Sequence, residues 1–126
     1  MDERSATILL DGEPFELLLT TRATREIAKR YGGLENLGEK LMKAENFEMA
    51  LDEIIGLIVL LANQPILIHN MKHPEEKREL LTQEYVELLT SPFDLAEYKD
   101  AIMEAMVRGT NRNIESENEG KNTQAG

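Results

Sequence analysis

The stretch IIGLIVLLA, from Ile54 to Ala62, contains no polar side chain, although 30% of the residues in this chain are charged. Apolar positions upstream, beginning at Phe47, follow helical spacing, so the sequence predicts a helix that begins at Asn46 and is apolar on every side in its second half. Such a helix is either enclosed by its own domain or completed by another chain. A membrane span needs about 20 apolar residues, and we expect Asn63-Gln64-Pro65 to end this run first.

Length and composition favour one domain. A chain of 126 residues can bury one core. Hydrophobic residues make up 41% of it, aromatic residues only 5%, and there is no Trp. The core is therefore expected to be aliphatic.

Charge and cysteine content indicate which partners are disfavoured and which cellular compartment is expected. The 24 acidic and 14 basic residues give a net charge of −10, which disfavours binding to nucleic acid or to anionic membranes. There is no Cys, as is common in a reducing cytoplasm. The N-terminus MDERSATILL lacks the pattern of a secretory signal. We expect a cytoplasmic protein.

The region before the apolar run predicts a hairpin and two helices. The apolar runs 6–10 and 15–19 flank Asp11-Gly12-Glu13-Pro14, which predicts two antiparallel strands with a four-residue connection. A helix is expected over Thr21 to Tyr31, with Ala23, Ile27, Ala28 and Tyr31 inward and a stop at Gly32-Gly33. A short helix of roughly ten residues follows, marked by Leu34, Leu37, Leu41 and Met42 and interrupted at Gly38.

The region after the run predicts a connection and two more helices. Ile66, Leu67 and Ile68 lead to His73-Pro74, where a helix is expected to start and to reach Thr90 with Leu80, Leu81, Tyr85, Leu88 and Leu89 inward. Ser91 caps the last helix together with Asp94, and its stripe is Leu95, Tyr98, Ile102, Ala105 and Met106. That helix is expected to end near Arg108-Gly109.

The expected architecture is mainly α: a single domain over residues 1–109, with an N-terminal β-hairpin over 6–19 and about five helices, and a polar C-terminal tail. The tail, residues 110–126, has Ile114 as its one large apolar residue. It cannot bury enough apolar surface to offset its ordering entropy, so we expect it to be disordered.

Catalytic and ligand motifs are sparse. The glycines do not have the spacing of a nucleotide-binding loop. His69 and His73 are four residues apart, but they fall in an expected loop and lack the Glu of a zinc protease pattern. No serine has a base at hand, and there is no Cys nucleophile. The sequence predicts a protein that is not an enzyme, with no catalytic residue, cofactor or metal site.

Three segments carry a resemblance to a known family. They are the hairpin ILLDGEPFELLL, the basic helix TRATREIAKRYGG leading into LENLGEKL, and the helix MALDEIIGLIVLLANQ. With these, the chain resembles the tail assembly chaperones of long-tailed bacteriophages and related prophages over about residues 6–65, and in general helical layout over 66–108. It departs from the family at Leu19-Thr20-Thr21, where an aromatic residue is common. The family often also makes a longer product by translational frameshifting, and the polar tail is a place where such an extension could begin.

The resemblance implies a function in tail morphogenesis. Such a chaperone holds the tape measure protein, a long helical chain with exposed apolar surface, and recruits tail tube subunits. It acts in the bacterial cytoplasm, tends to self-associate into a homo-oligomer, and is not expected in the mature virion. The candidate partner-binding residues are apolar positions around the central run and a basic set on the first helix: Leu57, Leu60, Leu61, Ile66 and Ile68, and Arg22, Arg25, Lys29 and Arg30. Ordinary core positions and a solvated helix face are the alternatives for these two sets.

Two other functions remain open from the sequence. An acidic inhibitor that mimics nucleic acid would carry carboxylates spaced like phosphates on one face, whereas here acidic residues are interleaved with Lys and Arg. A head-to-tail connector or another structural virion component would form a stable closed ring.

Overall fold

The computed structural model describes residues 4–43 and 51–125, with side chains described up to residue 110. The described residues form a two-stranded antiparallel sheet and five helices. In chain order these are β1 (Ser5–Leu10), β2 (Glu13–Leu18), α1 (Thr21–Tyr31), α2 (Leu34–Lys43), α3 (Leu51–Lys72), α4 (Gln83–Leu89) and α5 (Pro92–Ala125). The expected mainly helical fold with an N-terminal hairpin is confirmed.

The hairpin has a tighter turn than the sequence suggested. Asp11 and Gly12 both have positive φ, 52° and 80°, and Leu10 pairs directly with Glu13. The connection is thus the two residues Asp-Gly, because this dipeptide adopts the turn whose twist matches paired strands. Pro14 lies inside β2 opposite Leu9, so the predicted four-residue connection is wrong.

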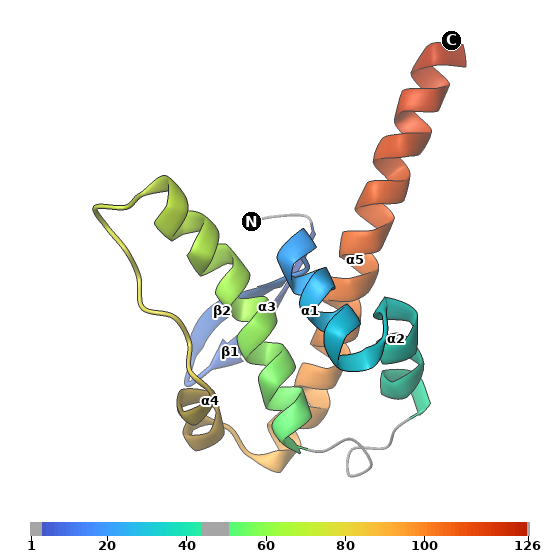
Figure 1. The fold of residues 1–126 in the computed structure, drawn as a ribbon. Coiled ribbons are helices and arrows are strands. Elements are labelled where there is room, and N and C mark those ends of the chain that lie inside the picture. Colours follow the sequence, from blue (N-terminus) through green and yellow to red (C-terminus); the bar gives the residue numbers. More distant parts are fainter. Residues whose placement is uncertain (1–3, 44–50, 126) are drawn as a thin grey trace.

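The hairpin joins the two long helices into one core. In Figure 1, α3 and α5 rise from the same end of the molecule and diverge. β2 packs against α3 and β1 packs against α5. Side chains that alternate along β1 point into this core, as do the apolar stripe of α5 and one side of α3. The buried residues from these three elements include Ala6, Ile8, Leu10, Ile54, Leu57, Ile58, Leu61, Leu95, Tyr98, Ile102, Ala105 and Met106.

The central helix is longer than predicted. α3 continues through Pro65 to Lys72, so the predicted stop at Asn63-Gln64-Pro65 is wrong, and Ile66 and Ile68 lie in the helix. Proline removes one intrahelical donor. Next to it, the Gln64 side chain folds back on the same helix and donates from Nε2 to the Leu60 carbonyl at 2.9 Å. The predicted start at Asn46 lies outside the described residues.

The first two helices match the sequence closely. Thr20 caps α1, accepting a hydrogen bond from the Ala23 amide at 3.1 Å, and Gly32 ends it in the left-handed conformation with φ 88°. Ala23 and Ile27 are buried. Ala28, which was predicted to face inward, is exposed. Met42 is also exposed, and α2 runs through Gly38 without the predicted interruption.

The segment between α3 and α4 was predicted to be helical from Pro74, which is wrong. Residues 73–82 instead return along α3 as an extended segment, held by two asparagines two helical turns apart. Asn63 exchanges two hydrogen bonds with the backbone of Leu81 (2.7 and 2.9 Å), and Asn70 does the same with Arg78 (2.8 and 3.0 Å). These side chains act as pairing partners for a segment with no neighbouring strand.

As a result α4 is only seven residues long. Of the five residues predicted to point inward on this helix, Leu81 is buried and Leu89 is partly buried. Leu80, Tyr85 and Leu88 are exposed, and Val86 takes the core position instead.

The last helix begins as predicted and continues further. The Ser91 amide donates to the Asp94 carboxylate at 2.9 Å, which completes the cap, and the five predicted stripe residues are buried. Gly109 does not end the helix. It lies against Leu19, and an added Cβ would come within 3.1 Å of that side chain, so the glycine permits close packing.

Beyond Gly109 the helix projects away from the body as far as Ala125 (Figure 1). The predicted end near Arg108-Gly109 is therefore not where the helix stops. The expectation that residues 110–126 are disordered in the free protein stays a prediction.

Among the described residues, α3 is long and apolar enough to cross a membrane by length and composition. Of its most apolar window, 39% is buried within the domain. Core helices pass the same test, and α3 contributes its buried side to the packing with the hairpin and α5.

Candidate docking groove

The apolar candidates divide into core and surface. Leu57 and Leu61 have no exposed area and belong to the central core, so their assignment to a partner surface is wrong for the folded chain. The apolar run has no polar side chain to indicate which side faces inward, and the structure resolves this. Leu60, Ile66 and Ile68 are partly exposed.

The basic candidates share the exposed side of α1. Arg22, Arg25, Lys29 and Arg30 are all exposed. Arg30 pairs with Glu26 at 3.6 Å. Within residues 4–43 and 51–110, Arg22, Arg25 and Lys29 form no ion pair. Three cations of one helix therefore face solvent without an ion-pair partner in this part of the chain.

Leu60 and these cations meet in a surface groove between α1 and α3. One hollow of about 270 Å³ is lined by Leu60, Glu26 and all four basic residues. A neighbouring hollow of about 310 Å³ shares Arg22, Arg30 and Leu60 and extends along α3 to the segment before α4. We call these two hollows together the α1–α3 groove. The lining of the second hollow adds Gly56, Val59, Asn63, Gln64, Leu67, Leu80 and Gln83.

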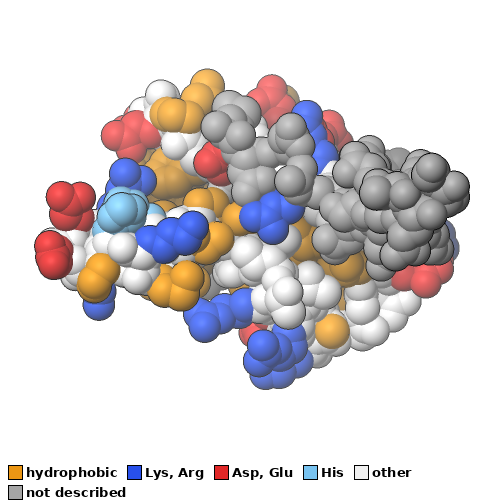
Figure 2. Space-filling view, turned by 90° about the horizontal axis from the view of Figure 1, so that it is seen from above, with side chains coloured by type: hydrophobic (Ala, Val, Ile, Leu, Met, Phe, Trp, Pro, Cys, Tyr) orange, Lys and Arg blue, Asp and Glu red, His pale blue; other side chains and the backbone are white. Residues whose placement is uncertain are grey.

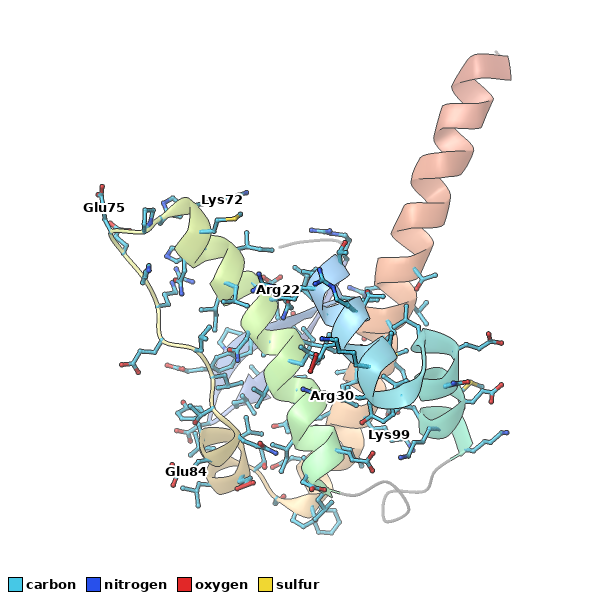
Figure 3. All side chains as sticks on the ribbon, viewed as in Figure 1. Arg22, Arg30, Lys72, Glu75, Glu84 and Lys99 are labelled. Carbon is cyan, nitrogen blue, oxygen red and sulfur yellow. The ribbon has the colours of Figure 1, made fainter. Side chains whose placement is uncertain are left out.

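The floor of this groove is apolar and its α1 rim is basic. Val59 and Leu60 are adjacent on α3, Leu67 lies about two turns further along the same helix, and Leu80 is brought alongside by the returning segment. At Gly56 the floor is bare backbone, and an added Cβ would lie 3.5 Å from Arg30 Nη1. Figure 3 shows Arg22 and Arg30 on α1 beside α3. Figure 2 shows hydrophobic side chains interleaved with Lys and Arg on the face seen from above.

One end of the groove continues into a region with acidic groups. A third hollow of about 430 Å³ shares Arg30, Gly56 and Gln83 and adds Tyr31, Asp52 and Glu53. Partial burial raises the pKa of Tyr31, and the negative charge of Glu53 raises it further. The α1 side of the α1–α3 groove thus carries four cations and one carboxylate, Glu26, and further acidic groups follow beyond Arg30.

Sequence reasoning found the basic set and Leu60 but missed Leu67 and Leu80 as part of the same surface. Leu67 was expected in a connection and Leu80 in the core of a helix. Their meeting depends on the path of residues 73–82 along α3, which Asn63 and Asn70 determine. Those asparagines, seven residues apart on an apolar helix, were the available signal.

The histidines lie away from the groove lining. His69, in the last turn of α3, contacts the Glu76 carbonyl through Nε2 at 2.9 Å, and its ring lies 4.8 Å from that of His73. No group of three or more potential metal ligands occurs among the residues the structure describes.

Comparison with known proteins gives no assignment. No protein-family model matches the chain. No curated protein matches it either, and the same holds for solved structures. Functional inference therefore rests on the surface just described and on the sequence resemblance.

Proposed function

We propose that this protein is a tail assembly chaperone of a long-tailed bacteriophage or prophage. It binds the tape measure protein in the bacterial cytoplasm and recruits tail tube subunits. It acts by non-covalent binding rather than by catalysis, and its resemblance to that family supplies the identity of the partners.

The exposure of large apolar side chains supports a binding role most directly. Phe93 is 90% exposed and Leu88 is 76% exposed, at the junction of α4 and α5, and Tyr85 and Leu80 are also exposed nearby in the chain. Exposed apolar clusters mark surfaces that bind other proteins. A helical tape measure protein with unsatisfied apolar faces is a suitable partner for such a surface.

The test is co-expression with the tape measure and tail tube proteins encoded beside this chain, followed by pull-down and light scattering. The tape measure protein is expected to remain soluble and to co-purify only when this chain is present. The double variant Leu88→Ser/Phe93→Ser is expected to reduce the captured amount severalfold. Since both side chains are exposed, this variant keeps the fold.

Met42→Ser is the matched control, because Met42 is 74% exposed but lies on α2. Capture of neither neighbour by the wild-type chain would contradict the proposed function. Steeply salt-dependent binding to a basic enzyme would instead indicate the acidic inhibitor, and a stable closed ring without partners would indicate a connector.

A further inference from the structure

We propose that the α1–α3 groove is the docking site for an amphipathic helix of a partner protein that carries carboxylates along one edge. This deepens the proposed function, on which it rests for the identity of the partner. The exposed Leu88 and Phe93 are not part of the groove lining.

The rim determines the charge of the ligand. Arg22, Arg25 and Lys29 are spaced by three and four residues, so they lie along one side of α1 over about 10 Å. No described residue forms an ion pair with them, since Glu26 in the same hollow pairs with Arg30, although the whole chain has a net charge of −10. Carboxylates at the same helical spacing on a partner would meet all three cations.

The floor determines the rest of the ligand. Val59, Leu60, Leu67 and Leu80 give the groove an apolar base beside the cations. A bare anion or a flexible acidic tail would leave this base wet. Apolar side chains adjacent to the carboxylate edge would cover it, and one face of an amphipathic helix provides both groups in register.

The chain's overall charge argues against a polyanion as the ligand. Nucleic acid or an anionic membrane would extend beyond the rim and meet the acidic remainder of the surface, including Asp52 and Glu53 at the end of the groove. A helix that spans only the rim avoids this repulsion.

The experiment uses fluorescein-labelled helical peptides of about 15 residues, titrated with the full chain and followed by fluorescence anisotropy. The first peptide has Leu on one face and Glu along its edge. In the second, Gln replaces the Glu residues, and in the third, Ser replaces the Leu residues. The first is expected to bind about tenfold more tightly than either of the others.

Variants of the chain locate the site. Arg25→Glu/Lys29→Glu is expected to weaken the first peptide by about tenfold or more, whereas Lys43→Glu/Lys77→Glu, the same charge change at exposed cations outside the groove lining, is expected to change binding less than about twofold. A fourth peptide with Lys in place of Glu is expected to prefer the Arg25→Glu/Lys29→Glu variant over the wild type. Loss of folding cannot produce that reversal.

Four results would overturn the inference. If the Ser peptide bound as tightly as the first peptide, the apolar floor would contribute nothing to binding. If the two double variants weakened the first peptide equally, binding would depend on the net charge of the chain and not on the groove. Self-association of the chain that Arg25→Glu/Lys29→Glu abolishes would make the groove an interface between copies. If the peptide binds but the tape measure protein is not captured, only the proposed function is contradicted. If the tape measure protein is captured equally well by the Arg25→Glu/Lys29→Glu variant, only the groove is contradicted.

Discussion

The hydroxyl of Thr20 donates a hydrogen bond to the side-chain oxygen of Gln64 while it caps α1. The two oxygens are 2.5 Å apart, and the same hydroxyl oxygen accepts from the Ala23 amide at 3.1 Å. Gln64 is only 4% exposed. This polar pair, in which Gln64 is buried and Thr20 partly so, attaches the first turn of α1 to α3 and sets the relative position of the two walls of the α1–α3 groove.

Thr20→Val is expected to lower the free energy of unfolding by about 1–2 kcal/mol, because it removes both the cap and the bond to Gln64. Gln64→Leu is expected to cost about 1 kcal/mol, and the double variant less than the sum. Urea unfolding measures all three. Thr21→Val, at an exposed neighbour, is the control and should change stability by less than about 0.5 kcal/mol. Strict additivity of the two changes would show that Thr20 and Gln64 do not interact.

The asparagine pair gives a prediction about the returning segment. Asn63→Ala is expected to destabilise the fold by about 1–3 kcal/mol, since it leaves the N–H and C=O of buried Leu81 without their partner. Asn70→Ala, at a partly exposed position, is expected to cost about 0.5–1 kcal/mol.

Hydrogen exchange measures each change at the amide that loses its acceptor. Asn63→Ala should accelerate exchange most at the Leu81 amide, and Asn70→Ala should do so at the Arg78 amide. Asn36→Ala removes one side-chain bond to the Tyr31 carbonyl at the other end of the groove and should leave both amides unchanged. Unaltered exchange in the Asn63 and Asn70 variants would show that these side chains do not hold the segment.

The hairpin turn predicts an asymmetry between adjacent positions. Gly12→Ala is expected to lower the free energy of unfolding by about 1–2 kcal/mol, because Gly12 has φ 80° and a Cβ there is strained. Nothing lies within 4 Å of the added Cβ, so the effect is one of backbone conformation. Asp11→Asn, where φ is 52°, should be neutral or slightly stabilising. Thermal unfolding measures both variants, and an equal loss of stability in Gly12→Ala and Asp11→Asn would contradict this assignment of the turn.

Tyr98 predicts a dependence of stability on alkaline pH. Burial raises the pKa of Tyr98 above its ordinary value of 10.0, and the charges of Asp94 and Glu97 raise it further. The folded state therefore favours the neutral phenol, and this contribution to stability is present below pH 10.0 and is lost as the pH rises above it.

Tyr98→Phe removes the hydrogen bond to the Leu9 carbonyl at 2.7 Å, so it should cost about 1 kcal/mol at neutral pH. Above about pH 10 its stability should fall less steeply than that of the wild type. Guanidinium unfolding at a series of pH values, with absorbance titration of the phenols, measures both effects. Parallel pH profiles for the two proteins would show that Tyr98 does not titrate differently on folding.

Local sequence signals were sufficient to predict the elements near the two ends of the domain, namely the hairpin, α1 and the start of α5. Asp11-Gly12 predicted the hairpin, Thr20 and Gly32 bounded α1, and Ser91 with Asp94 began α5, because a cap or a turn depends on neighbouring residues alone. The buried stripe of α5 from Leu95 to Met106 followed from amphipathic spacing in the same way.

The middle of the chain could not be predicted in this way. The apolar run around Leu57 and Leu61 has no polar face, so its rotation depends on where the hairpin and α5 lie. Pro65 looked like a helix end because its missing donor is a local signal, whereas α3 is held through this turn by tertiary contacts such as the hydrogen bond of Gln64 with Thr20. The groove combines Leu60 with Leu80, which requires the tertiary path of residues 73–82.

The contact between Arg108 and the Ser5 carbonyl, at 2.8 Å, joins positions 103 residues apart and brings the start of the domain against its last packed turn. During translation, β1 can therefore pack against α5 only after nearly the whole domain has been synthesised. Such long-range closure slows folding and leaves the apolar segment 54–62 uncovered in the nascent chain. A truncation that ends the chain before Gly109 is expected to abolish the fold. A change of sequence after Ala125 lies outside every core contact described above.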